Sequence, residues 1–182
     1  MQKYKEIELH TDRLSLVRIK GETHGTEVNE VLCDTIHSLE PWIDWAHKKP
    51  TVKETIKRLR TQTDNNENFV FNIYLQAEKT NTLIGNIKLE STDQPKCYEV
   101  GYWLHQKHCG KGFTTECVQR LIKFARDELK TSRLCMYFAD ENEACQRVAQ
   151  KTGFRFVKFV DFKSEIRLEW GVRKSHYFEL DL

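Results

Sequence analysis

The spacing of apolar residues changes several times along the chain, and each change predicts an element. In the first half, short alternating or continuous apolar runs predict strands. They occupy residues 14–19, 69–75 and 83–89. The polar stretch at 78–82 joins the last two runs, so we expect these to form a β-hairpin. Apolar residues at helical spacing predict helices over about 22–34 and 52–63.

The second half of the chain alternates between strand and helix patterns. Residues 98–104 have a strand pattern. Because successive side chains of a strand point to opposite sides, we expect Val100, Tyr102 and Leu104 to share one face. An apolar stripe then predicts a helix that follows Gly112 and runs to about Lys130. The remaining ranges are strands at 134–138, 154–160 and 176–180 and a short helix at 142–151.

This order of elements predicts a mixed α/β (α+β) fold. A hairpin-rich first half followed by strand–helix–strand–helix–strand is typical of a central sheet with helices on both faces. The last helix has clear end signals, since Asn142 suits its N-cap and Gly153 the left-handed position after its end. No repeat or Pro/Gly-rich linker interrupts the chain, so we expect one domain over residues 1–182.

Composition excludes several classes of function. Lys and Arg (29) nearly balance Asp and Glu (27), and the net charge of +2 provides no field that would attract nucleic acid. No run of about 18 apolar residues is present to span a membrane. Residues 1–10 lack the apolar core of a secretory signal. The six cysteines form no CxxC pair and do not cluster with histidine, so we expect reduced thiols in a cytoplasmic protein and no zinc site.

The first chemical signal is the turn Gly110-Lys111-Gly112, between a predicted strand and a predicted helix. Unpaired N–H groups and the helix dipole meet at a helix N-terminus, which favours a bound phosphate or pyrophosphate. Lys107 and Lys111 add positive charge. The turn is not a P-loop, because no Gly-Lys-Ser/Thr ends it. It is not a dinucleotide fingerprint either, because Glu116 stands where the third glycine is needed.

Two longer motifs give the chain a resemblance to the GNAT superfamily of N-acetyltransferases. The first, from Glu99-Val-Gly-Tyr-Trp-Leu through the glycine turn to Phe-Thr-Thr-Glu116, is similar to the superfamily's cofactor signature. The second, from Asn142 to Phe154, resembles its Asn, Arg-Val and Lys-x-Gly-Phe signature. The opening Thr11-Asp-Arg-Leu-Ser-Leu and the aromatic loop at 39–45 resemble the branch that acetylates N-terminal amines of ribosomal proteins.

The resemblance implies a GNAT fold, with a mixed, mostly antiparallel sheet of about six or seven strands. It also implies acetyl-CoA as co-substrate, with no metal. In this superfamily the amides of the turn hold the pyrophosphate, and the preceding strand end and an asparagine contact the pantetheine arm. The matching positions are Trp103, Leu104, His105, Lys107, His108, Cys109, Gly110, Lys111, Gly112, Phe113, Thr114 and Asn142. Lys107 replaces the usual Gln or Arg, so the bidentate fork of Arg is absent.

Catalysis requires a neutral amine, a hydrogen-bond donor for the developing oxyanion and a proton for the thiolate leaving group. A free N–H near Leu104, at the strand end, suits the oxyanion. Many relatives supply the proton from a tyrosine at the position of Ala149, and this branch from a serine where Cys145 stands. A thiol matches the pKa of the leaving group. The alternatives for Cys145 are a small buried side chain or a nucleophile that carries the acetyl group.

Two glutamates are candidates for the general base. Glu165 falls near a glutamate that the branch has been proposed to use, and its alternative role is an exposed charge in a loop. Glu99 lies in the strand beside the cofactor groove, and its alternative is a solvent-facing or paired strand residue.

Trp42 and Trp45 are candidates for the acceptor pocket, because large amphipathic rings in a loop can line a binding site; core packing is the alternative. The resemblance implies direct attack in a ternary complex by the N-terminal α-amine of a protein such as a ribosomal protein. The enzyme is then a monomer or homodimer. One alternative acceptor is a small amine, a polyamine or an aminoglycoside, which an acidic pocket near Glu40, Asp44 and Glu78 would favour. A non-catalytic acetyl-CoA sensor is the second alternative.

Overall fold

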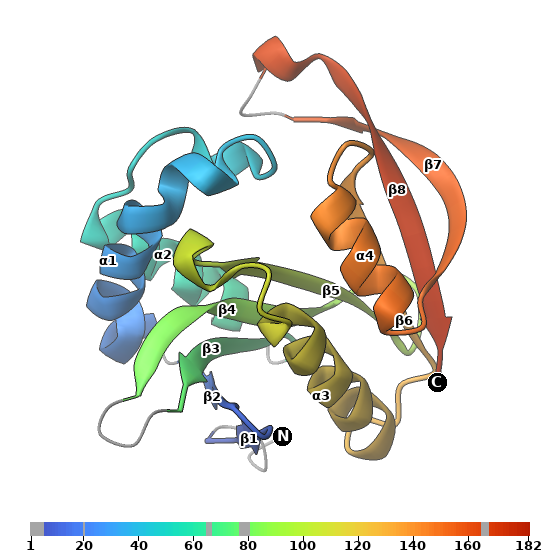
Figure 1. Cartoon of the computed structure of the whole chain (residues 1–182), viewed down its shortest axis with the longest axis horizontal. Coiled ribbons are helices and arrows are strands. Elements are labelled where there is room, and N and C mark those ends of the chain that lie inside the picture. Colours follow the sequence, from blue (N-terminus) through green and yellow to red (C-terminus); the bar gives the residue numbers. More distant parts are fainter. Residues whose placement is uncertain (1–5, 20, 65–66, 77–80, 165–167) are drawn as a thin grey trace.

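The computed structural model describes residues 6–19, 21–64, 67–76, 81–164 and 168–182. In this part of the chain, eight strands form one sheet in the order β1-β2-β3-β4-β5-β6-β8-β7 (Figure 1). The strands are β1 (Glu8–His10), β2 (Leu14–Arg18), β3 (Phe69–Leu75), β4 (Thr82–Ser91), β5 (Cys97–Leu104), β6 (Arg133–Ala139), β7 (Arg155–Lys163) and β8 (Val172–Asp181).

The sheet is mixed and mostly antiparallel, as expected. Every neighbouring pair is antiparallel except β5 and β6, which are parallel. β3 and β4 pair antiparallel, as predicted, although most of the turn between them lies outside the described residues. The strand that the pattern misses is β1, which has three residues and only one buried side chain, Leu9. Such a short strand gives no detectable period.

Four α-helices accompany the sheet in the described chain. They are α1 (Gly21–Leu39), α2 (Val52–Asp64), α3 (Phe113–Asp127) and α4 (Glu143–Lys151). Short 3-10 segments occur at η2 (Asp44–His47), η3 (Gln106–His108) and η4 (Leu168–Trp170). α1 runs past its predicted end near residue 34, because Ile36 and Leu39 continue its buried stripe. No helix of the described chain is long and apolar enough to cross a membrane.

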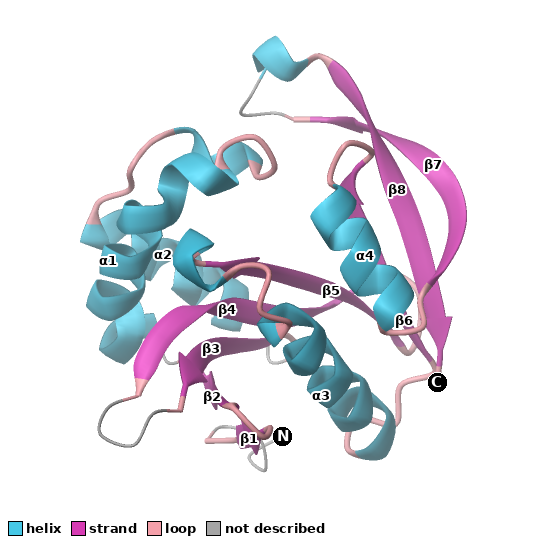
Figure 2. Ribbon diagram, viewed as in Figure 1, coloured by secondary structure: helices cyan, strands magenta, loops and turns pink. Residues whose placement is uncertain are grey.

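The helices cover opposite faces of the sheet (Figure 2). On one face, Phe71 and Val100 pack in a core with α3 residues such as Leu121. On the other face, Val70 and Trp103 pack in a second core with residues of α1 and α2. Neighbouring residues of one strand therefore belong to different cores, which is the alternation expected of a sheet buried on both sides.

The feature that positions the site is the divergence of β5 and β6. They pair only at their first residues, from Cys97 opposite Arg133 to Glu99 opposite Cys135. Beyond this point β5 stays paired with β4 as far as Leu104, while β6 stays paired with β8 (Figure 1). The two halves of the sheet thus separate next to the glycine turn that follows β5.

Candidate active site

The glycine turn has the backbone of an anion cradle. Gly110 and Gly112 adopt φ values of 75° and 81°, a left-handed region that glycine reaches without strain. Gly112 is the N-cap of α3, and the first bond of the helical ladder runs from the amide of Glu116 to the carbonyl of Gly112 (3.1 Å). The amides of residues 110–115 thus precede the ladder, at the positive end of the helix dipole.

Arg13, the residue just before β2, supports this turn. Its guanidinium donates to the Lys111 carbonyl (3.2 Å) and pairs with the Glu116 carboxylate (2.6 Å). It also lies over the Phe113 ring, 4.5 Å from the centroid. Glu116 accepts a further hydrogen bond from the Thr11 hydroxyl. Residues 11–13 therefore connect the first strands to the glycine turn. Glu116, which stands where a dinucleotide fingerprint has its third glycine, is the carboxylate that binds Thr11 and Arg13.

α1 supports the turn from the other side. The carboxylate of Asp34 accepts from Nε2 of His105 (2.8 Å) and contacts Nζ of Lys107 (3.2 Å). The hydroxyl of Thr35 accepts from the amide of Gln106 (2.9 Å). Hydrogen bonds from His105 and then Lys107 lower the pKa of Asp34. The ammonium of Lys107 is therefore engaged with α1.

The open edge of β5 presents backbone groups. The amide of His105 donates to the carbonyl of Ile84 on β4 (2.8 Å). Residues that face one neighbour alternate along a strand, so Trp103 also bonds toward β4 while Tyr102 and Leu104 direct their backbone groups toward the diverging β6. This geometry gives Leu104 the free edge that the oxyanion donor needs. The Trp103 side chain is buried among α1 and α2.

The three remaining predicted cofactor residues, His108, Cys109 and Thr114, lie just before or just after the glycine turn. Burial, followed by the charges of Lys111, His105 and Lys107, lowers the pKa of His108, so its ring is neutral at pH 7. The ring lies 6.4 Å from that of Phe113. The Cys109 thiol is 3.7 Å from the His105 carbonyl, and Thr114 is half-buried in the first turn of α3.

The start of α4 faces the same region. Asn142 is buried and caps the helix, its side-chain carbonyl accepting from the amide of Cys145 (3.1 Å). A ligand would thus be held through the amide nitrogen of Asn142. Burial raises the pKa of Cys145, which keeps it a neutral thiol at pH 7 and disfavours the nucleophile role. Ala149 is fully buried one turn later, and Gly153 follows the helix with a φ of 89°, as predicted.

Glu99 lies on the α1–α2 side of β5, at the last residue that pairs with β6. Burial raises its pKa, the Lys88 cation lowers it and the Glu90 carboxylate raises it further, with a net upward shift. Lys88 itself pairs with Glu90. A raised pKa makes a carboxylate a stronger proton acceptor, which is the property that the predicted general base needs. Glu165 and Glu78 lie outside the described residues.

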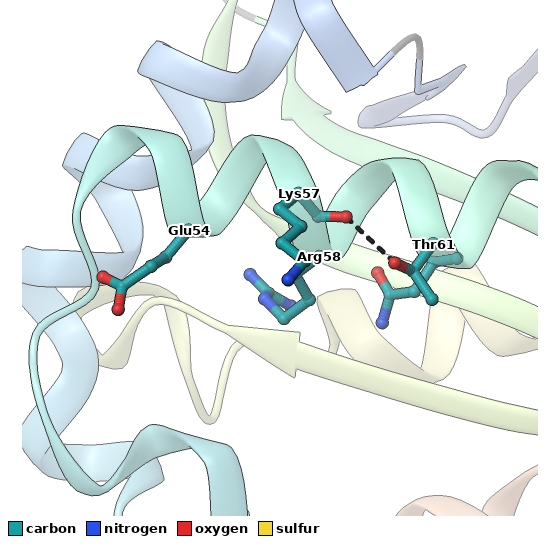
Figure 3. Close-up of a pocket in the computed structure, with 5 residues that line it drawn as sticks. Glu54, Lys57, Arg58 and Thr61 are labelled. Carbon is teal, nitrogen blue, oxygen red and sulfur yellow. Dashed lines mark hydrogen bonds between the residues drawn. The ribbon is translucent and has the colours of Figure 1, made fainter.

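The two tryptophans have different environments. Trp42 is 40% exposed, whereas Trp45 packs against the α1–α2 core. The guanidinium of Arg58 stacks on Trp45, 4.0 Å from the ring centroid. Beside it, one face of α2 lines a pocket of about 340 Å³, with Lys57 and Arg58 at its middle (Figure 3).

The lining of this pocket carries two cations, Lys57 and Arg58, and one carboxylate, Glu54. Arg58 has a buried Nη2 atom with no hydrogen-bond partner in the described chain, and burial lowers its pKa to about 10, so it stays charged at pH 7. Glu54, at one end of the pocket, accepts from the backbone and hydroxyl of Thr51 and pairs with Lys48.

The carboxylate of Asp44, in the segment between α1 and α2, also has hydrogen-bond partners. Asp44 accepts hydrogen bonds from the amide of Trp45 (2.7 Å) and from the hydroxyl of Ser164 (3.2 Å). Within the described residues no group of three His, Cys, Asp or Glu side chains is arranged to hold a metal ion. Of the three carboxylates predicted for an acidic acceptor pocket, Asp44 thus has local hydrogen-bond donors, Glu40 is half-buried just after α1, and Glu78 lies outside the described residues.

Sequence reasoning found the turn and Asn142 but missed the contacts that support the turn. Arg13 lay in a quoted motif without an assigned role. Asp34 gave no signal, because its partner His105 is 71 positions away in sequence. Nothing in the sequence pattern distinguishes Arg58 from other helix residues, because its contact with Trp45 forms only in the folded chain.

Comparisons with known proteins agree with this geometry. A family model described as "Acetyltransferase (GNAT) domain" matches residues 13–155. YdaF of Bacillus subtilis is 35% identical over 74 residues, a stretch that spans only 40% of either protein. The ribosomal-protein-serine acetyltransferase of Escherichia coli is 22% identical over 135 residues, covering 74% of this chain and 75% of that one.

A solved structure shares the fold over nearly the whole chain. It is RimL, a ribosomal L7/L12 alpha-N-protein acetyltransferase in complex with coenzyme A. The two superpose with a TM-score of 0.85, covering 97% of this chain and 98% of the other, at 16% identity.

Proposed function

The chain belongs to the GNAT family of acetyltransferases, and from that premise we propose that it transfers the acetyl group of acetyl-CoA to the N-terminal α-amine of a protein, such as a ribosomal protein. RimL and the E. coli relative are both named for acetylation of ribosomal proteins. The separation of β5 from β6 beside a glycine-capped helix N-terminus is the observation that carries the proposal.

The residues present fit acetyl-CoA. The amides of 110–115 suit the pyrophosphate, since they lie before the α3 ladder and at its positive end. The exposed backbone edge at Tyr102 and Leu104 suits the amide groups of a pantetheine arm, and Asn142 adds a side-chain amide from the facing helix. When bound, acetyl-CoA supplies an activated thioester carbonyl.

The protein's own groups then have distinct roles in direct transfer. Glu99, with its raised pKa, takes a proton from the acceptor amine on the α1–α2 side through water, because five strand residues, about 16 Å, separate it from the Leu104 amide. The amide of Leu104 donates to the carbonyl oxygen as charge develops there. Cys145, held neutral by burial, donates to the departing sulfur from α4.

The charge of the α2 pocket favours a peptide over a polycation. Arg58 and Lys57 repel a polyamine or aminoglycoside, which carries several positive charges. A protein N-terminus brings one amine and a chain of carbonyl acceptors, which the guanidinium of Arg58 can bind. This supports a protein acceptor for the enzyme.

The test is release of free CoA on incubation with acetyl-CoA and a panel of acceptors. N-terminal peptides of ribosomal proteins should turn over, whereas spermidine and aminoglycosides should not. Turnover of the small amines alone would reject the protein acceptor and keep the acetyltransferase. Tight acetyl-CoA binding without turnover of any amine would favour a non-catalytic sensor.

A further inference from the structure

Arg173, near the start of β8, is a cation that the mechanism above does not use. The ladder between β6 and β8 ends with Ala139 opposite Ser175, so Arg173 lies beyond the end of β6. Because side chains alternate along a strand, it lies on the same face of the sheet as Glu99. Its side chain is only 21% exposed, so most of its surface contacts protein.

The two ends of the Arg173 guanidinium bind two different loops. Nη1 donates to the carbonyl of Pro41 (2.8 Å), in the aromatic loop at 39–45. Nη2 donates to the carboxylate of Glu141 (3.1 Å), in the loop between β6 and α4. The guanidinium carbon also lies 4.7 Å from the centroid of the Trp170 ring, a cation–π contact that orients the fork. The planar fork of arginine can hold two acceptors in fixed directions at once.

Each of these contacts lies next to a residue that we assign to a substrate. Pro41 is followed by Trp42, a candidate for the acceptor pocket. Glu141 is followed by Asn142, which caps α4 and whose side chain suits the pantetheine arm. Arg173 therefore joins the acceptor side of the site to the cofactor side, and we call the Pro41–Arg173–Glu141 contacts the Arg173 bridge.

Further contacts connect the same parts of the molecule. The hydroxyl of Ser164, just after β7, donates to the carboxylate of Asp44 (3.2 Å), so both strands of the β7–β8 ribbon hold the segment between α1 and α2 (Figure 1). The amide of Asp140 donates to the carbonyl of Lys174 (3.0 Å), which fixes the ribbon to the β6–α4 loop. Since the β5–β6 ladder ends at Glu99, contacts of this kind replace strand pairing between the two halves of the sheet near the site.

We propose that Arg173 is a positioning residue that couples the cofactor site to the acceptor site, because its fork makes the aromatic loop and the β6–α4 loop settle together. A cofactor held by Asn142 fixes the start of α4, and the Arg173 bridge then fixes the aromatic loop. Coupling between two binding sites is reciprocal, so an acceptor in the loop tightens CoA by the same factor. The acceptor part of this coupling rests on the proposed function, whereas the response of the loop to CoA does not.

The first experiment uses CoA alone and needs no acceptor. Hydrogen exchange of the amides of residues 42–47 is followed by mass spectrometry with and without saturating CoA. In the wild type, CoA should slow this exchange about threefold or more. In Arg173→Gln the segment should exchange faster, and CoA should have no effect on it. A purely structural role would raise the exchange rate but leave the response to CoA.

Two further variants test whether the bridge itself carries the response. Glu141→Ala removes one end of the bridge at a side chain that is 67% exposed, so the fold is kept, and it should also abolish the response to CoA. Arg155→Gln is the matched control, since Arg155 is an arginine of the same ribbon that pairs with Asp181 at the far end of β8 (2.8 Å). Its response to CoA should equal that of the wild type.

Calorimetric titration then measures the coupling. An N-terminal peptide of a ribosomal protein should bind about tenfold more tightly to the wild type when CoA is present, and equally tightly to Arg173→Gln with or without CoA. A wild-type segment that ignores CoA, or a response that persists in both Arg173→Gln and Glu141→Ala, overturns the proposal. If the response to CoA depends on Arg173 but no peptide binds, the acceptor assignment fails and the Arg173 bridge stands.

Discussion

Gly110 and Gly171 hold similar backbone conformations at very different places. Their φ values are 75° and 59°, and an added Cβ at either would meet no atom within 4 Å. Alanine therefore costs only backbone strain at both sites, about 1–2 kcal/mol. Only Gly110 lies in the turn that we assign to the pyrophosphate.

Replacing each glycine by alanine separates strain from binding. Both Gly110→Ala and Gly171→Ala should lower the free energy of unfolding by about 1–2 kcal/mol. Only Gly110→Ala should also raise the Kd for CoA, by about tenfold, because the turn amides lose their alignment. Calorimetric titration with CoA and denaturant unfolding measure the two effects. Equal CoA affinity in the two variants would remove the turn from the binding site.

The base assignment predicts a pH dependence. A base works in its ionised form, so kcat/KM should rise with pH through the raised pKa of Glu99. Glu99→Gln should lower kcat about 100-fold and abolish this limb. Glu90→Gln, which changes the carboxylate directly opposite on β4, is the control and should keep the limb. A limb that survives in Glu99→Gln assigns the base elsewhere.

At the scale of elements, the contact between α1 and the cofactor turn is the least expected feature. Asp34 holds His105 and Lys107, the residues that lead from β5 into the turn. Its lowered pKa means that the contact is present above the ordinary pKa of aspartate and is lost as pH falls through the lowered value. The contact is therefore complete throughout the neutral range.

Asp34→Asn should loosen the turn. We expect KM for acetyl-CoA to rise about threefold to tenfold with acceptor KM unchanged, since a charge-assisted contact becomes a neutral one. Glu30→Gln is the matched control, because Glu30 is an exposed acid on the same helix. Initial-rate kinetics at pH 7 give both constants. If KM for acetyl-CoA is the same in both variants, α1 does not position the turn.

The elements themselves could be predicted because most carry a strong period. β3 begins and ends where the alternation predicts, and the capping residues of α4 are the ones expected. β1 could not be predicted, since a strand of three residues has no period and depends on pairing with β2. The supports of the turn were also beyond prediction, because contacts between Asp34 and His105 arise only when the sheet brings distant segments together.

At the scale of the whole molecule, the two faces of the sheet bear different kinds of binding groups. The α3–α4 face and the open edge of β5 bear the groups that fit acetyl-CoA, while the α1–α2 face bears Trp45 and its cationic neighbour Arg58. The sequence motifs predicted the groups of the first face, because these groups are a glycine turn and the Asn142 helix cap, which are both local in sequence. The second face depends on side chains from several segments, so only its tryptophans could be predicted and Arg58 could not.

This division predicts that Arg58 affects the acceptor alone. Arg58→Gln removes the cation stacked on Trp45 and should raise the acceptor KM about fivefold while KM for acetyl-CoA stays constant. Lys53→Gln, an exposed site on the same helix, should change neither constant. A rise in KM for acetyl-CoA in Arg58→Gln would contradict the separation of the two faces.

The central claim concerns which nitrogen receives the acetyl group, and one measurement addresses it directly. A peptide with a free N-terminus and one internal lysine is incubated with acetyl-CoA and the enzyme, and fragment-ion mass spectrometry locates the added acetyl group. The account predicts that it lies on the N-terminal α-nitrogen and that a peptide with a blocked N-terminus does not react. Acetyl on the lysine side chain, or no reaction with peptides alongside turnover of a polyamine, would contradict it.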